Sequence, residues 1–207
     1  YIPAGSTNDF AHSLQLATDP VAAAQQIADG KPEVLDLGQF DDRYFSYVAS
    51  FGAFTRASYA TPQSAKNALG HTAYMLGGIR ELSQIRKIHA RVELDGEVLE
   101  DDYIFGAICN GTSVGGILTL DPKQVDMGDG VFEVLLARSP RDLGEIAECI
   151  GAIQKQQYNC RMLTFRSARQ VKLYTEKELD WTLDGEKASA QQNVTVTNLH
   201  RAIRLVK

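Results

Sequence analysis

The feature of this sequence that most constrains its fold is an alternation of apolar and polar residues, which dominates the chain from Ile88 onward. A period of two is typical of β-strands that bury one face. Many short strands with few helices favour an antiparallel sandwich or barrel over a parallel sheet. The segments with this pattern are KIHARVEL, EVLEDDYIFGAICN, GGILTL, GVFEVLLAR, RMLTFRS, QVKLYTE, LDWTL and RAIRLVK.

Helical patterns occupy the beginning of the chain and two later segments. Asn8 or Asp9 can cap a first helix, and Asp19-Pro20 begins a second one that Gly30 ends. Residues 61–86 also have helical spacing. The segment SPRDLGEIAECIGAIQKQQ predicts a helix among the strands, with Ser139 as its cap and Pro140 at the first helical position.

Between these helices, residues 33–48 return to a period of two on both sides of a polar turn at residues 41–42, which predicts a β-hairpin. We therefore expect an α+β chain. Its second part, residues 33–207, is expected to form a mostly antiparallel β-sandwich, preceded by helices in residues 1–32.

Charge and cysteine content narrow the class of function. A net charge of -5 over 207 residues disfavours a nucleic-acid partner, because phosphate contacts normally need a basic face. The three cysteines have no CxxC spacing, so they predict neither a disulfide framework nor a zinc site, and they favour a reducing cytoplasm.

Three segments have patterns that suggest binding sites, each with a plainer alternative. PAGSTNDFA places small residues before a helix N-terminus, where a phosphate could bind, but short capped loops of this kind are common. In DPKQVDMGDGVFEV, Asp126 and Asp129 could bind Mg²⁺, although a polar strand connection explains them as well. A basic segment could contact an anionic membrane or form a solvated face; its charges are Arg80, Arg86, Lys87 and Arg91.

The tetrapeptide LDGE occurs twice, at residues 94–97 and at residues 183–186. Asp-Gly between alternating segments is a strong signal for a two-residue hairpin turn. Local chemistry does not distinguish the two copies.

Several of these segments, taken in order, resemble the diacylglycerol kinase catalytic family, particularly its bacterial soluble lipid kinases. They are IPAGSTNDFA, DLG…YFSYVASFGAFT, LGHTAYMLGGIREL, VELDGEVLEDDYIFGAICNGTSVGGILTLDP, VDMGDGVFEVLLAR and WTLDGEKA. The resemblance implies an α/β nucleotide lobe with a Gly-Gly-Asp-Gly-Thr loop, followed by the β-sandwich. Residues 1–32 then correspond to the last part of that lobe, and the final strand of the chain can pair with it. The glycine-rich loop is not in this sequence.

The resemblance also assigns roles to residues. It selects Asp184 as the general base and leaves Asp95 in an ordinary hairpin. It implies a structural Mg²⁺ site formed by Asp126, Asp129 and the carbonyl of Val131. In the segment implied to contact the nucleotide, Ser6 stands in place of the family's usual threonine. The implied nucleotide contacts are Pro3, Gly5, Ser6, Asn8, Asp9, Gly185 and Glu186.

The implied activity is transfer of the γ-phosphoryl group of ATP, with Mg²⁺, to the hydroxyl of diacylglycerol or a similar lipid. The 207-residue chain is expected to be inactive alone. The expected location is the cytoplasm, peripheral to the inner face of the membrane. A homodimer is one possible oligomeric state. The alternatives are a sphingoid-base kinase of the same superfamily and a non-catalytic lipid-binding or regulatory module. An NAD kinase is less expected, because its Gly-Ser-Thr-Ala-Tyr run is not found.

Overall fold

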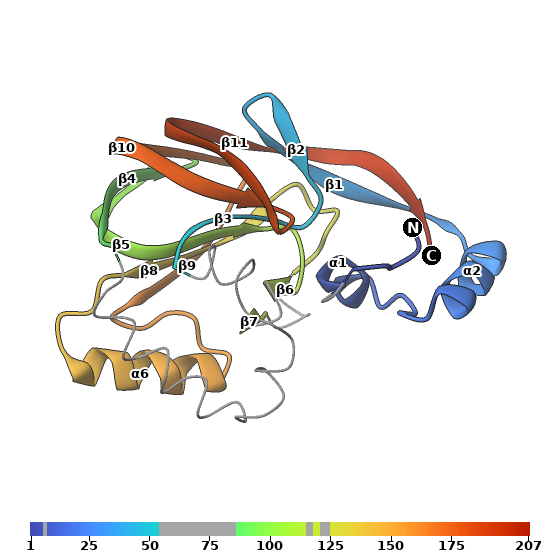
Figure 1. Ribbon diagram of the computed structural model, residues 1–207, viewed down its shortest axis with the longest axis horizontal. Helices are drawn as coiled ribbons and strands as arrows, with labels where there is room; N and C mark the ends of the chain where they lie inside the picture. The colour runs from blue at the N-terminus through green and yellow to red at the C-terminus, as the bar shows by residue number, and fades with distance from the viewer. Residues whose placement is uncertain (6–7, 54–85, 115–117, 121–124) are drawn as a thin grey trace.

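The computed structural model describes residues 1–5, 8–53, 86–114, 118–120 and 125–207 (Figure 1). The predicted helix over residues 61–86 lies outside these residues, except for Arg86. The helices are α1 (Asp9–Ser13), α2 (Pro20–Asp29) and α6 (Leu143–Gln154). The strands are β1 (Pro32–Phe40), β2 (Arg43–Phe45), β3 (Val48–Gly52), β4 (Ile88–Leu94), β5 (Glu97–Cys109), β6 (Ser113–Val114), β7 (Leu118–Thr119), β8 (Phe132–Arg138), β9 (Leu163–Ala168), β10 (Gln170–Leu183) and β11 (Glu186–Val206).

The strands form a mostly antiparallel sheet that curls into a sandwich, as the sequence predicted. Its order is β2-β1-β11-β10-β3-β5-β8-β9, and β4 pairs with both β10 and β5. The first part of β10 pairs with β4 and its last residues pair with β3, while β5 likewise pairs with β4 and then with β3. Figure 1 shows β10 and β11 above β5 and β8, with α6 below them.

Two strands are longer than the sequence patterns indicated. QVKLYTE and LDWTL were expected to be separate strands, but both belong to β10, whose pairing with β11 shifts register between Tyr174 and Leu179 and again before Trp181. The expected final strand begins at Arg201, whereas β11 begins at Glu186. The described buried positions of this added part are Ala188, Val194, Val196 and Asn198. Because two of them are small or polar, the apolar alternation is weak there and a search for it misses the strand.

Aromatic rings fill the interior between the two halves of the sheet. The ring of Trp181 lies 5.0 Å from that of Phe40 and 4.9 Å from that of Phe51. Two strand glycines make room for this packing, since a Cβ atom on Gly38 or Gly106 would come within 2.2 Å of a phenyl ring. Close approach of a ring to the backbone is therefore the reason for these glycines.

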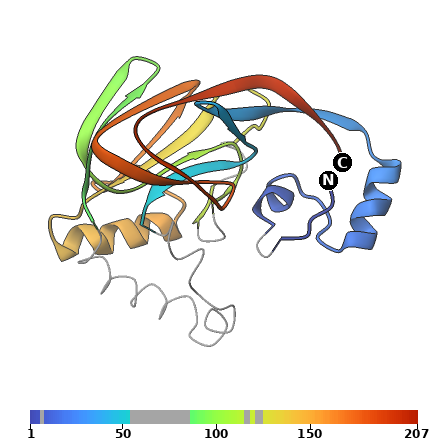
Figure 2. The same ribbon diagram turned by 45° about the horizontal axis from the view of Figure 1, so that its top comes forward.

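Strand β8, which pairs with β5 and β9, is buried on both faces, which explains its nearly unbroken apolar sequence. Phe132, Val134 and Leu136 face the sandwich interior. Leu135 and Ala137 face a second cluster, which contains Ile146 and Cys149 of α6. Helix α6 therefore covers the outer face of the sheet, and Figure 2 shows it at the opposite end of the molecule from α1 and α2.

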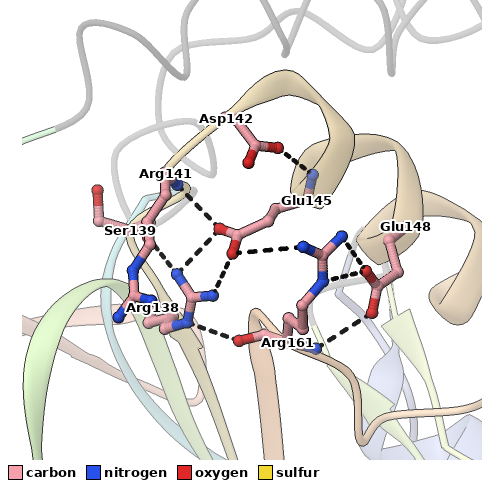
Figure 3. A network of polar contacts seen from close by, with 7 residues as sticks. All are labelled: Arg138, Ser139, Arg141, Asp142, Glu145, Glu148 and Arg161. Carbon is pink, nitrogen blue, oxygen red and sulfur yellow. Dashed lines mark hydrogen bonds and ion pairs between the residues drawn. The ribbon is translucent and has the colours of Figure 1, made fainter.

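A charged network fixes α6 to this face (Figure 3). The Arg138 guanidinium donates to both carboxylate oxygens of Glu145, at 3.0 and 2.6 Å, and the Arg141 N–H donates to the same carboxylate at 2.9 Å. The bonds from Arg138 and then from Arg141 lower the pKa of Glu145 to about 2. Arg161 extends the network to Glu148 by a bond of 2.6 Å.

The expected cap of α6 was wrong. The helix begins at Leu143, and the Asp142 side chain accepts from the Glu145 N–H at 2.9 Å. Ser139 is held outside the helix because its N–H donates to the Asp102 carbonyl at 2.6 Å. A contact between strands therefore outweighs the local Ser-Pro signal.

The signals for α2 are confirmed. The Asp19 side chain accepts from the Ala22 N–H at 2.9 Å, Pro20 is the first residue, and Gly30 follows the last. At α1 the outcome differs, because Asn8 precedes the helix with φ 51° and its side chain makes no capping bond. It accepts from the Gly5 N–H instead, at 2.9 Å.

The end of the chain returns to its beginning. β11 pairs with β1 along residues 32–40, and Lys31 and Lys207 exchange main-chain hydrogen bonds of 2.9 and 3.3 Å. The N- and C-termini therefore lie close together near α2 (Figure 1). The division of the chain into domains at residues 32 and 33 stays a prediction.

Candidate active site

The LDGE turn between β10 and β11 holds Asp184 in one orientation. Asp184 has φ 50° and Gly185 has φ 86°, as a tight hairpin turn requires. Its Oδ2 accepts from the Ser46 N–H at 2.6 Å, and its Oδ1 accepts from the N–H groups of Tyr47 and Val48 at 2.9 and 3.0 Å. The segment that joins β2 to β3 therefore orients the carboxylate.

Residues near the start of the chain reach the same place. The Phe10 ring stacks on the Tyr47 ring at 6.3 Å, and the Tyr1 ring meets Phe10 edge-on at 5.3 Å. Burial raises the pKa of Tyr47 above its ordinary value, and the nearby charges of Asp9, Asp184, Tyr1 and Glu186 raise it further. The structure thus brings Tyr1, Asp9 and Phe10 together with the turn at residues 184–186 around Tyr47.

The residues predicted to contact the nucleotide occupy different environments along this segment. Pro3 and Asp9 are buried, Gly5 is exposed, and Asn8 is half-buried. Ser6 lies outside the described residues. On the opposite turn, Gly185 and Glu186 are both exposed. The described members of the predicted set therefore lie on two segments that meet at Tyr47, and their contact with a nucleotide stays a prediction.

The residues predicted to bind Mg²⁺ form a compact acidic loop. Asp126 Oδ1 accepts from the Gly128 N–H at 2.9 Å, and Asp129 Oδ1 accepts from the Val131 N–H at 3.0 Å. These bonds leave Oδ2 of each carboxylate for a metal, and the Val131 carbonyl, which accepts from Asn198 Nδ2 at 3.1 Å, keeps a second lone pair.

Glu133 lies near this acidic loop. Burial raises the pKa of its carboxyl to about 8, and the charges of Asp129 and Asp126 also raise it, so Glu133 is largely neutral at pH 7. The carboxylates of Asp126 and Asp129 are oxygen donors of the kind that suits a hard divalent cation. Among the described residues, no group of three or more His, Cys, Asp or Glu side chains is arranged to hold a metal. The predicted set contains only two carboxylates and a carbonyl, so Mg²⁺ binding stays a prediction.

Sequence reasoning missed Asp36, a fully buried carboxylate on β1. Its Oδ2 accepts from the Gly130 N–H at 2.6 Å and its Oδ1 from the Arg201 N–H at 2.7 Å, with His200 Nδ1 3.2 Å away. It lies at the register shift between β1 and β11 and fixes the acidic loop to both strands. A charged residue between Leu35 and Leu37 was the signal that could have identified it.

Asn110 and Glu133 are two further buried polar residues that the patterns did not single out. Each stands at or near the end of an apolar strand, where a polar residue is expected to be exposed. A buried polar side chain needs a partner, so an isolated polar residue in an apolar run is a usable sequence signal.

Comparison with known proteins agrees with this arrangement. Residues 47–207 match the family model described as the YegS C-terminal NAD kinase beta sandwich-like domain, and residues 1–40 match the diacylglycerol kinase catalytic domain. The chain therefore belongs to the family of the YegS C-terminal NAD kinase beta sandwich-like domain. The two matches follow one another along the chain, as the resemblance in the sequence implied.

Relatives of this chain include proteins named diacylglycerol kinase. The protein from Bacillus subtilis is 29% identical over 206 residues, which cover 99% of this chain and 67% of the relative. The protein from Staphylococcus saprophyticus is 27% identical over 186 residues, which cover 89% of this chain and 60% of the relative. With a Staphylococcus aureus relative, of which 58% is covered, the chain spans about three fifths to two thirds of these proteins.

A solved structure shares the fold. The crystal structure of a diacylglycerol kinase from Bacillus anthracis strain Sterne has a TM-score of 0.74 and 22% identity, covering 99% of this chain and 67% of that one. At this identity, the likeness concerns the fold alone. In the described part of the chain, no helix has the length and apolar character needed to cross a bilayer.

Proposed function

We propose that this protein acts as an ATP-dependent lipid kinase, which transfers the γ-phosphoryl group of ATP to the hydroxyl of diacylglycerol or a similar lipid. The observation that carries the proposal is the meeting of Tyr1, Asp9 and Phe10 with the Asp184 turn around Tyr47. In a chain that resembles the diacylglycerol kinase catalytic family, this meeting places a segment expected to contact the nucleotide beside a carboxylate suited to hold a hydroxyl.

Asp184 would orient the hydroxyl that attacks phosphorus. A carboxylate has about four lone-pair sites, and three main-chain N–H groups bind those of Asp184. About one site is left for a substrate O–H, so the direction of that bond is fixed before substrate arrives. Phosphoryl transfer has a loose transition state in which the proton leaves late, and positioning matters more than basicity.

ATP and Mg²⁺ are the cofactors of this proposal. Bound Mg²⁺ supplies neutralisation of phosphate charge in reactions of this class. The residues that would contact nucleotide are Pro3, Gly5, Ser6, Asn8, Asp9, Gly185 and Glu186. Asp126, Asp129 and the Val131 carbonyl would hold a separate, structural Mg²⁺, for which the two carboxylates of the acidic loop provide a fitting charge.

The lipid would be met at a membrane surface, with the protein in the cytoplasm and peripheral to the inner face. Arg86 and Lys87 are exposed and available for anionic headgroups. Arg91 is less available, since it pairs with Glu93 at 2.7 Å and lies 5.6 Å from the Tyr174 ring. Arg80 lies outside the described residues.

Phosphorylation of lipids by the full-length gene product tests the proposal. Labelled ATP and Mg²⁺ would be supplied with vesicles that contain diacylglycerol, a sphingoid base or no acceptor. We expect labelled phosphatidic acid from diacylglycerol. Preference for the sphingoid base would identify the related kinase, and lipid binding without label transfer would identify a non-catalytic module. The same assay with the 207-residue chain tests the expectation that this segment is inactive alone.

A further inference from the structure

Asn110, the residue that follows β5, contacts the segment that orients Asp184. Its side chain is 1% exposed. Its main-chain N–H donates to the Tyr47 carbonyl at 2.8 Å, and its Nδ2 makes a longer bond of 3.4 Å to the Ser46 carbonyl. The same Nδ2 donates to the Asp36 carbonyl at 3.1 Å, which ties this residue to β1.

The two carbonyls that Asn110 holds belong to peptide groups whose N–H ends hold Asp184. The Ser46 carbonyl and the Tyr47 N–H are the two ends of one peptide group, and the Tyr47 carbonyl and the Val48 N–H are the ends of the next. Both of these N–H groups donate to Asp184 Oδ1, at 2.9 and 3.0 Å. Because a peptide group is planar and rigid, fixing its carbonyl also fixes the direction of its N–H.

The turn that begins at Asn110 also reaches α1. The Thr112 N–H donates to Ser13 Oγ at 3.0 Å, and Ser13 Oγ donates to the Asp9 carbonyl at 3.0 Å. Residues 110–112 therefore contact both the segment that orients Asp184 and the helix that follows the predicted nucleotide segment.

We propose that Asn110 is a positioning residue, whose side chain sets the orientation of the Asp184 carboxylate through the peptide group that joins Ser46 to Tyr47. The side chain acts through this main-chain group and has no contact with the reacting atoms. The bond from the Asn110 N–H to the Tyr47 carbonyl is a main-chain bond that any residue except proline can make at this position. The effect of the side chain on phosphoryl transfer rests on the function proposed above, whereas its effect on the Tyr47 amide does not.

Amide hydrogen exchange in the 207-residue chain tests the structural part. Asn110→Leu keeps a similar volume but has no donor, and Asn110→Ser is a milder variant if the first does not fold. We expect exchange at Tyr47 to become at least about tenfold faster. Val48, whose peptide group keeps the main-chain bond from residue 110, should change less, and Arg169 and Gln170, which hold Asp95, should keep their rates. Asn159→Ala is the control, because it also removes an asparagine side chain that bonds to the main chain: Asn159 Oδ1 accepts from the Phe165 N–H at 3.0 Å.

Kinetics of the full-length gene product test the consequence. Asn110→Leu should lower kcat by about tenfold with little change in KM for ATP, while Asn159→Ala should not. In an Asp184→Asn background, Asn110→Leu should change the residual kcat by less than about twofold, because a residue that acts only through Asp184 has nothing left to position.

An equal loss of kcat in both backgrounds would overturn the proposal, as would unchanged exchange at Tyr47. If the wild-type protein phosphorylates no lipid, the proposed function fails. The exchange rates then decide the role of Asn110 by themselves.

Discussion

The two LDGE turns share a local structure and differ in everything around it. Asp95 and Asp184 have φ 48° and 50°, and the following glycines have φ 103° and 86°. Each carboxylate also accepts hydrogen bonds from main-chain N–H groups of another segment. Asp95 accepts from Arg169 and Gln170 at 2.7 and 2.8 Å, as Asp184 accepts from residues 46–48. The turn at Asp95 is the expected hairpin, but it also joins β4 and β5 to the start of β10.

The surroundings separate the two carboxylates. Asp184 is half-buried near Asp9, Tyr47 and Glu186, whereas Asp95 is exposed. The groups behind them also differ. Asn110 bonds to the peptide groups that hold Asp184, in part through its side chain. One of the peptide groups that hold Asp95 contains the Arg169 carbonyl. Among the described bonds, this carbonyl accepts only from a main-chain N–H, that of Asn198 at 2.9 Å. A shared motif therefore supplies the turn and its main-chain contacts, and the neighbours determine whether the carboxylate meets a substrate.

The largest expected effect on activity is that of Asp184→Asn in the full-length gene product. The substitution keeps the size of the side chain but removes its charge and one of its two acceptor oxygens. We expect kcat for lipid phosphorylation to fall by roughly 10²-fold or more, with ATP binding retained, as measured by initial rates and by titration with a nucleotide analogue. Retention of full activity would remove the distinction between the two turns.

A second prediction concerns the acidic loop that contains Asp126 and Asp129, and tests whether this loop binds a cation. The folded pKa of Glu133, about 8, lies above its ordinary 4.5, so the stability associated with this group is present below pH 4.5 and lost as the pH rises through 8. Chemical denaturation of metal-free chain should show a loss of up to about 1.4 kcal/mol per pH unit. Glu133→Gln should flatten this slope, and Mg²⁺ should oppose it if Asp126 and Asp129 bind the ion. A slope unaffected by Mg²⁺ would contradict the metal site.

The third prediction concerns the hairpin that carries Asp95. Its first strand, β4, begins directly after Lys87 and ends before Asp95. Reversing the charges of Arg86 and Lys87 to glutamate should weaken binding to anionic vesicles by about 1 kcal/mol or more per residue and increase its sensitivity to salt. Sedimentation with vesicles measures this effect, and turnover of a soluble, short-chain acceptor should be unchanged. Equal vesicle binding would mean that these charges form only a solvated face.

The smallest effect is expected for Asp95→Asn, the matched counterpart of Asp184→Asn. Asparagine tolerates the positive φ but offers one acceptor oxygen where Asp95 uses two. We expect a loss of about 1 kcal/mol in unfolding free energy by urea denaturation, with kcat changed less than twofold. A large loss of activity with unchanged stability would show that the two turns have equivalent roles.

The sequence predicted most elements correctly where one physical requirement acted alone. Asp19, Pro20 and Gly30 bounded α2 because capping and the geometry of proline are local effects. The same reasoning failed at α6, where the Ser139 N–H pairs with Asp102 of a distant strand and leaves Asp142 to cap the helix. It also divided β10 in two, because a change of partner along one strand interrupts the alternation without ending the strand.

By itself, the sequence determined the antiparallel sandwich, the hairpin turns at both LDGE copies and the resemblance that favours Asp184. Period-two patterning and Asp-Gly turn geometry need only neighbouring residues, so they can be identified along the chain. Only the tertiary structure placed Asp9, Tyr47 and Asp184 together and disclosed Asp36 and Asn110 as buried supports. The contacts of Asp36 and Asn110 join residues more than sixty positions apart, and the partner of a buried polar group depends on which strands the fold brings to its side.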